Sequence, residues 1–288
     1  MRQSLWIGLL SLVMLMGTVN SARGSDQHTW VGRQVMAKSA RSRPRIGDRP
    51  SSKTIICVRT VGRTKGNWLS VGDGWLRHDE VVAIDDAVAW FTAQIHERPS
   101  AFSYVSRAAA RCAHGDYHGA EADCVAALRI QPHFDAAYYY RAAAQAARGR
   151  FAEAVGDYTA AIRLNPRLTG AYLDRGAARL KLSDYRGSLA DVNTALRLAP
   201  RTPDAYYVRG VARFHLHQYQ GALADLNVAL RANPARAVAY DIRGACKQEL
   251  GQVAEAMRDF DKALELDPDS VSARAHRDHL RMARAAGN

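Results

Sequence analysis

Alanine, tyrosine and proline recur from about residue 100 onward with a period of thirty-four residues. Each proline follows an alanine by five positions, and a tyrosine holds a third fixed place. The positions are Pro132, Pro166, Pro200, Pro234 and Pro268; Ala127, Ala161, Ala195, Ala229 and Ala263; and Tyr104, Tyr138, Tyr172, Tyr206 and Tyr240. A fixed period of this length indicates a repeat architecture in which each unit packs on its neighbours.

Each period holds two stretches with helical spacing, separated by a short turn such as Ser183-Asp184-Tyr185. The closing proline ends the second stretch because it cannot continue a helix. Small residues recur where two helices must approach closely, at Ala120, Ala154, Ser188, Ala222, Ala256, Gly176, Gly210 and Gly244. A bulkier side chain there would overpack the crossing by about 1 to 3 kcal/mol. The pattern therefore predicts stacked helix hairpins.

This pattern resembles the tetratricopeptide repeats, in which an aromatic residue, a Leu-Gly pair, two alanines, a second aromatic residue and a proline hold fixed places. The unit from Tyr206 to Pro234 matches all but one place, because Arg209 stands where leucine is usual. The resemblance implies a mainly α fold, a right-handed α-solenoid of helix hairpins. We expect repeats at residues 101–134, 135–168, 169–202, 203–236 and 237–270, and a polar capping helix at 271–286.

A partial repeat precedes these units, because Ala87, Phe91, Ile95 and Pro99 reproduce the spacing of a second helix. We expect this helix, within residues 81–99, to join the repeats rigidly to an upstream domain at residues 27–80. That domain has short β-rich runs, including 33–38, 54–59 and 68–71, separated by turn residues. Several short strands in a small segment predict a small β-barrel.

The segment around Asn67-Trp68 and Gly74-Trp75 resembles the final strands of bacterial SH3-like domains. That family's domain is a binding module, often for peptides or cell-wall material, and the resemblance implies the same here. Trp68 and Trp75 are then candidates for a ligand groove. The alternative is that both are core residues of a small barrel.

The chain starts with a short positive segment, Met1-Arg2, followed by an apolar stretch and by small residues at Ser21 and Ala22. This is the layout of a secretory signal peptide at residues 1–22. An uncleaved anchor is the alternative, because residues 3–22 are uncharged and about long enough to span a bilayer. In both cases we expect an exported protein, periplasmic or at the cell surface.

The formal net charge of +12 favours acidic partners or anionic surfaces in general. The basic run at 38–49 would suit an anionic envelope polymer or lipid head groups, whereas no nucleic acid is expected. Charges also repeat in register, with arginines at Arg107, Arg141, Arg175, Arg209 and Arg243 and aspartates at Asp123, Asp157, Asp191, Asp225 and Asp259. Paired opposite charges cancel, so they create no field that would attract a ligand. We therefore favour a ladder of ion pairs over a charged stripe for a ligand, and each exposed pair would contribute about 0 to 1 kcal/mol of stability.

No phosphate-binding loop, nucleophile elbow or isolated carboxylate pair appears in the sequence, so we expect no enzyme and no cofactor. Cys112, His114, Asp116 and His118 are residue types that bind metals, but they straddle a turn where polar residues are normal. His276 and His279 form a weaker pair. We predict no metal site. Cys112 and Cys124 fall within one hairpin, where they could form a disulfide. We favour the alternative that both are buried thiols.

In tetratricopeptide repeats the first helices line a concave groove, and four of their places contact the ligand. Carried over, these places hold Phe102, Val105, Tyr139, Tyr140, Leu173, Lys181, Tyr207, Phe214, His215, Asp241, Gln248 and Glu249. The lysine and asparagine clamp for chaperone tails is absent from them. The sequence predicts a scaffold that binds a protein or peptide. The alternative is an envelope anchor in which the basic upstream domain binds wall polymer or lipid.

Overall fold

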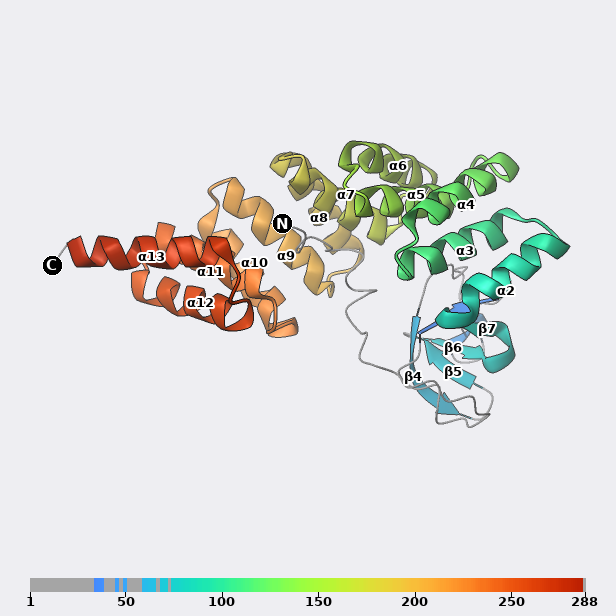
Figure 1. Cartoon of the computed structure of the whole chain (residues 1–288), viewed down its shortest axis with the longest axis horizontal. Coiled ribbons are helices and arrows are strands. Elements are labelled where there is room, and N and C mark those ends of the chain that lie inside the picture. Colours follow the sequence, from blue (N-terminus) through green and yellow to red (C-terminus); the bar gives the residue numbers. More distant parts are fainter. Residues whose placement is uncertain are drawn as a thin grey trace. The chain divides into compact units, whose positions relative to one another are not determined.

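The structure is a computed structural model that describes residues 34–38, 45–46, 49–50, 59–65, 68–71 and 74–286 (Figure 1). The chain divides into two compact units, Met1–Pro166 and Arg167–Asn288. The expected signal peptide and most of the basic run lie outside the described residues. Among the described helices, none combines the length and the apolar character that crossing a bilayer requires.

The first unit starts with an antiparallel sheet in the order β3-β2-β6-β5-β4-β1-β7. Its strands are β1 Gln34–Ala37, β2 Arg45–Ile46, β3 Arg49–Pro50, β4 Arg59–Lys65, β5 Trp68–Val71, β6 Gly74–Arg77 and β7 Val81–Ala83. A shift in register between Val61 and Thr64 marks an irregularity where β4 pairs with β5. The expected runs at 33–38 and 68–71 hold β1 and β5, whereas 51–58 lies outside the described residues. A closed barrel stays a prediction.

Helix α2, Ile84–Glu97, follows β7 directly and joins the sheet to the repeats. It contacts β1, β7 and α3. Its buried face carries Ala87, Phe91 and Ile95, and the same apolar cluster includes Met36 of β1 and Val82 of β7. Because sheet and helices share one core, the junction is packed rather than a flexible linker.

Two hairpins complete the first unit. They consist of α3 Ala101–Ala113 with α4 Tyr117–Ile130, and α5 Asp135–Ala147 with α6 Phe151–Leu164. Ser100 caps α3 by accepting a hydrogen bond from the Ser103 amide, and Asp116 caps α4 through the Gly119 amide. The first helices α3 and α5 contact each other, and α4 packs on α5. The helices therefore form two layers.

The second unit holds three hairpins and a final helix. Its helices are α7 Thr169–Lys181, α8 Tyr185–Leu198, α9 Pro203–His215, α10 Tyr219–Ala232, α11 Ala237–Glu249, α12 Val253–Leu266 and α13 Val271–Ala286. The first helices α7, α9 and α11 contact in series, and α13 continues that layer by contacting α11 and α12. Figure 1 shows α13 beside α11 and α12. This is a short solenoid with its last helix in the capping place.

Each hairpin turn has one residue with a positive φ at the same place of the period. These residues are Gly115, Gly149, Ser183, His217 and Gly251, with φ between 58° and 79°. Glycine adopts this left-handed conformation without a steric penalty, whereas serine and histidine do not. Two turns of the second unit therefore hold a strained residue.

Candidate functional site

The repeated charges form a ladder of ion pairs inside the hairpins. In each repeat the arginine of the first helix donates two hydrogen bonds to the aspartate sixteen residues later, on the second helix. The pairs are Arg107–Asp123, Arg141–Asp157, Arg175–Asp191, Arg209–Asp225 and Arg243–Asp259, at 2.6 to 2.9 Å. The arrangement confirms the ion-pair ladder and joins the helices of one repeat.

Further groups surround each ion pair. The repeat tyrosine lies three residues before the arginine, with its ring centre 5.1 to 5.8 Å from the guanidinium carbon. A second cation reaches the same aspartate in four repeats: Arg111, Arg179, Arg213 and Lys247. The hydrogen bonds that these arginines donate to aspartate raise the pKa of Arg107, Arg141, Arg209 and Arg243. The charges satisfy one another, so the ladder is a structural feature.

Burial changes the energetic value of the ladder. Asp123, Asp191, Asp225 and Asp259 are only 3 to 4% exposed. The small energy expected for exposed pairs therefore does not apply, because removing one partner of a buried pair costs about 3 to 5 kcal/mol. In addition, Arg209 donates to Asn193 and Arg243 to Asn227 of the preceding second helix, so the guanidinium also joins neighbouring repeats.

Five of the predicted groove residues are buried. Val105 is fully covered, and Tyr140, Leu173, Tyr207 and Asp241 are 5 to 8% exposed. This corrects the expectation that they contact a ligand, because a side chain inside the helix packing offers a partner no surface. The ring of Tyr207 is covered by Arg236, 4.5 Å above its centre, and burial raises its pKa to about 12.

Asp241 is buried because α13 covers it. Ser272 Oγ donates to Asp241 Oδ2 at 2.5 Å, and His276 Nδ1 lies 2.8 Å from Oδ1. The imidazole also stacks on Phe260 at 5.2 Å. The carboxylate that the sequence placed at the acidic end of a groove thus holds the capping helix.

The other predicted groove residues keep some surface. Phe102, Tyr139, Lys181, Phe214 and Gln248 are half-buried, and His215 and Glu249 are exposed. In the first unit, Phe102 packs against Phe91 at 6.3 Å and Tyr139 against Tyr158 at 5.8 Å. In the second unit, burial lowers the pKa of Lys181. These side chains remain candidates for contact within their own units.

A group of five partly exposed rings lies in the second unit and is here named the ring cluster. It consists of Tyr185, Phe214, His215, His217 and Tyr219. Tyr185 of α8 stacks on His215 of α9 with centroids 4.3 Å apart and planes at 9°. Phe214 contacts His215 at 5.3 Å and Tyr219 of α10 at 6.0 Å.

His217 completes the ring cluster in a strained conformation. Its φ is 58°, and its Nδ1 lies 2.7 Å from the hydroxyl of Tyr219. Three of the other four turns have glycine at this place. Strained residues cluster at functional sites, so His217 is a candidate for a functional role.

Sequence reasoning identified Phe214 and His215 but missed Tyr185, His217 and Tyr219. A signal for two of these residues is present in the sequence. An aromatic residue recurs with the period of thirty-four at the start of the second helix, at Tyr117, Phe151, Tyr185 and Tyr219. Burial, and next the nearby His217, lower the pKa of His215. The stacked imidazole is therefore neutral at pH 7, and the ring cluster offers flat apolar faces with polar edges.

Several of the residues weighed as metal ligands have other contacts. Asp116 caps α4 and pairs with Arg111, and His114 Nε2 lies 3.2 Å from the Ile84 carbonyl. In the described part of the chain, no three histidine, cysteine, aspartate or glutamate side chains converge. Cys112 and Cys124 are free and buried, and burial raises the pKa of Cys112 to about 12. Trp68 and Trp75 lie on the paired strands β5 and β6, but their side chains fall outside the described residues.

A family model described as the tetratricopeptide repeat matches residues 173–237. A second model of the same description matches residues 135–168 and 237–270. The matches fall on helices α5 to α12, which hold four of the five ion pairs of the ladder and the whole ring cluster. A search of curated proteins finds no match.

Solved structures, tetratricopeptide-repeat proteins among them, have a similar fold over part of this chain. YrrB, described as a tetratricopeptide-repeat protein with an unusual peptide-binding site, is 21% identical with a TM-score of 0.56, over 65% of this chain and 97% of YrrB. MamA from Desulfovibrio magneticus is 22% identical with a TM-score of 0.53, over 59% and 97% of the two chains. A repeat protein from Parabacteroides merdae is 17% identical with a TM-score of 0.54, over 70% and 80%. At these identities the likeness shows the fold alone.

Proposed function

We propose that this chain, which contains tetratricopeptide repeats, is a non-catalytic scaffold whose second unit binds a protein or peptide at the ring cluster. The observation that carries the proposal is the stack of Tyr185 on His215, which holds one face of an exposed imidazole ready for contact. Phe102 and Tyr139 are the corresponding candidates in the first unit.

The chemistry of the ring cluster suits a peptide. Aromatic side chains provide a large contact area at low entropic cost, and they dominate binding energies at interfaces. Rings that already pack on each other lose little freedom when a partner binds. The likeness to YrrB, which is described by its peptide-binding site, agrees with a peptide as the class of partner.

The test is cross-linked capture from an envelope extract with residues 23–288 as bait. A Phe214→Ala, His215→Ala variant should lose the captured protein, because it removes two of the five rings of the ring cluster, including the stacked imidazole. The matched control is Val271→Ala, Met282→Ala, which removes two exposed apolar side chains of α13, 77% and 68% exposed. Circular dichroism must show that both variants are folded. Equal capture by both variants would exclude the ring cluster as the site.

We also propose that the protein is exported, on the strength of the sequence at residues 1–22. N-terminal sequencing of the protein from periplasmic and membrane fractions tests this proposal and separates cleavage after Ser21 or Ala22 from retention as an anchor. The full-length chain in the cytosolic fraction alone would contradict export. The alternative function, an envelope anchor through the basic upstream domain, stays a prediction, because most of its basic run lies outside the described residues.

A further inference from the structure

A cavity of about 420 Å³ opens in the second unit between α8 and the turn that joins α9 to α10. Its walls are Arg186, Leu189, Ala190, Asn193, Leu216 and Gln218. The volume falls in the range of ligand pockets. The α8 residues follow one another at helical spacing, so they lie on one face of that helix. The cavity shares no residue with the ring cluster.

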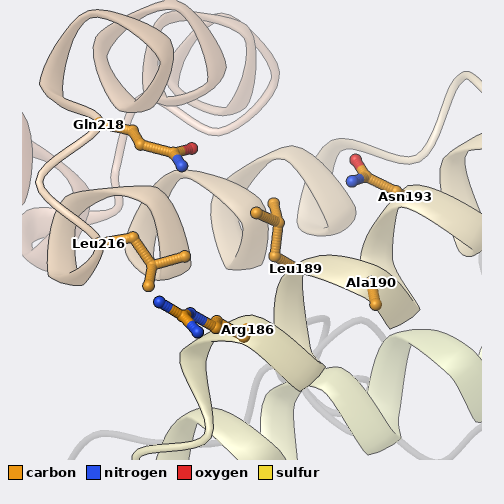
Figure 2. A pocket seen from close by; sticks show the side chains of 6 residues that line it. All are labelled: Arg186, Leu189, Ala190, Asn193, Leu216 and Gln218. Carbon is orange, nitrogen blue, oxygen red and sulfur yellow. The ribbon is translucent and has the colours of Figure 1, made fainter.

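The floor of the cavity is apolar and its polar groups stand at the rim. Leu189 and Ala190 of α8 form one side, and Leu216 forms the other. Figure 2 shows the Gln218 and Asn193 amides extending toward each other from opposite sides, and the Arg186 guanidinium next to the Leu216 side chain. An apolar floor with a few polar groups that fix orientation is the usual composition of a specific site.

Arg186 brings an uncompensated positive charge to this rim. It is exposed, and in the described part of the chain it has no acidic partner. The nearest acidic residue in sequence, Asp184, caps α8 through the Gly187 amide and pairs with Arg179 at 3.5 Å. The guanidinium therefore fits a carboxylate, which it can bind by two parallel hydrogen bonds.

The two amides fit a peptide backbone. Asn193 Oδ1 accepts a hydrogen bond from Arg209 at 3.1 Å, which leaves the amide nitrogen as a donor toward the cavity. Gln218 is exposed and offers both a donor and an acceptor. Peptide carbonyl and N–H groups are the matching partners, and a phosphate group would instead call for several cations.

The spacing sets the length of the ligand. Arg186 and Asn193 are seven positions apart on α8, which corresponds to about 10 Å along a helix axis. An extended chain covers this distance with about three residues.

We propose that this cavity binds a short acidic–aliphatic peptide segment of a partner protein. A glutamate or aspartate side chain of the segment pairs with Arg186. An aliphatic side chain packs on Leu189, Ala190 and Leu216, and the segment's backbone bonds to Asn193 and Gln218. This inference deepens the proposed function. It rests on that proposal in one respect, namely that the partner is a protein.

Fluorescence polarisation with a dye-labelled, amidated peptide Gly-Glu-Leu-Leu-Gly tests the proposal. Arg186→Gln should weaken binding about tenfold, because a charge-assisted hydrogen bond is lost. Ala190→Glu should weaken binding at least as much, since it places a carboxylate four residues after Arg186, where it pairs with the guanidinium and repels the acidic side chain of the peptide. Ala190 is exposed, so this variant keeps the fold. The matched control, Arg197→Gln, removes an exposed arginine of the same helix outside the cavity and should bind as the wild type does.

Three results with the wild-type protein would overturn the proposal. The first is no binding at millimolar peptide, and the second is equal binding of the matched Gly-Gln-Leu-Leu-Gly peptide. The third is a preference for a free terminal carboxylate over the glutamate side chain. The Phe214→Ala, His215→Ala variant separates the two sites. Loss of peptide binding in that variant with retention in Arg186→Gln would place the peptide on the ring cluster and exclude the cavity.

Discussion

Arg209 of α9 and Asp225 of α10 form a two-point ion pair, with Nε 2.8 Å from Oδ2 and Nη2 2.7 Å from Oδ1. Arg213 adds a third hydrogen bond to Oδ2 at 2.7 Å. The carboxylate is almost fully buried, and three donors replace the water that it loses. This geometry explains why Arg209 can stand where the repeat family usually has leucine, because its guanidinium ties two helices together.

Asp225→Ala should lower the free energy of unfolding by about 3 to 5 kcal/mol, because it leaves two guanidinium groups unpaired in a largely buried setting. Asp157→Ala should cost less. Its carboxylate is 13% exposed, and Gln145 replaces the second cation in that repeat. Urea unfolding followed by circular dichroism measures both. Equal losses would mean that the second cation and the deeper burial add nothing.

Gly244→Ala should destabilise the second unit by about 1 to 3 kcal/mol through overpacking. A Cβ at this place would lie 2.6 Å from the ring of Phe260 on α12. Gly156→Ala is the matched control on α6, where a Cβ meets nothing within 4 Å. This change should stabilise the first unit by about 0.5 to 1 kcal/mol, because alanine is the better helix former. Thermal melts of both variants test the contrast, and a fall in both would contradict it.

Ser183→Gly should raise the free energy of unfolding by about 0.5 to 1 kcal/mol. Serine has a φ of 59° at this turn, and glycine adopts that conformation without the steric cost, although it gains entropy when unfolded. The reverse change, Gly149→Ser, should destabilise its turn by a similar amount. Denaturant midpoints of the two variants should move in opposite directions. A shift in the same direction would show that side-chain contacts rather than φ decide the effect.

The hold of α13 on α11 should weaken as the pH rises. The hydrogen bond to Asp241 raises the pKa of His276, although burial opposes the shift. Because the pKa is raised in the folded protein, the protonated imidazole contributes its full stability below the ordinary pKa of 6.5. This contribution is lost as the pH rises through the pKa of the folded protein. Hydrogen exchange in α13, corrected for its intrinsic pH dependence, should therefore show more frequent opening at pH 8 than at pH 6.

His276→Gln is the control for this pH dependence, because glutamine keeps a hydrogen-bonding group without a proton to lose. Its α13 should open equally often at both values. The same pH dependence in His276→Gln as in the wild type would assign the effect to another group.

The hairpins could be predicted from the sequence because each carries its own signals, from the small residues at the crossings to the proline after the second helix. Pro166 and Pro200 lie two positions after the last residues of α6 and α8. The sheet was harder to predict from the sequence, because its strands are short and their pairing depends on contacts between segments that are distant along the chain. The runs that hold β1 and β5 could be identified, whereas the order of the seven strands could not.

The candidate site depends on how the helices are rotated and on what lies next to them. Val105 and Tyr139 both occupy groove places of the family pattern, yet one is fully buried and the other keeps surface. The burial of Asp241 follows from His276, thirty-five residues later. The stack of Tyr185 on His215 joins two neighbouring repeats. The residue pattern of a single repeat does not predict contacts with other repeats.

The core shared by Met36, Val82 and Phe91 also bears on the order in which the chain is made. Strands β1 and β7 leave the ribosome before α2 and α3, whose apolar faces they need. Domains fold as units, the N-terminal one first during synthesis. The nascent sheet must therefore wait, with its apolar face open, until α3 has emerged, and an early stop or a pause before that point would leave it exposed to chaperones and to aggregation.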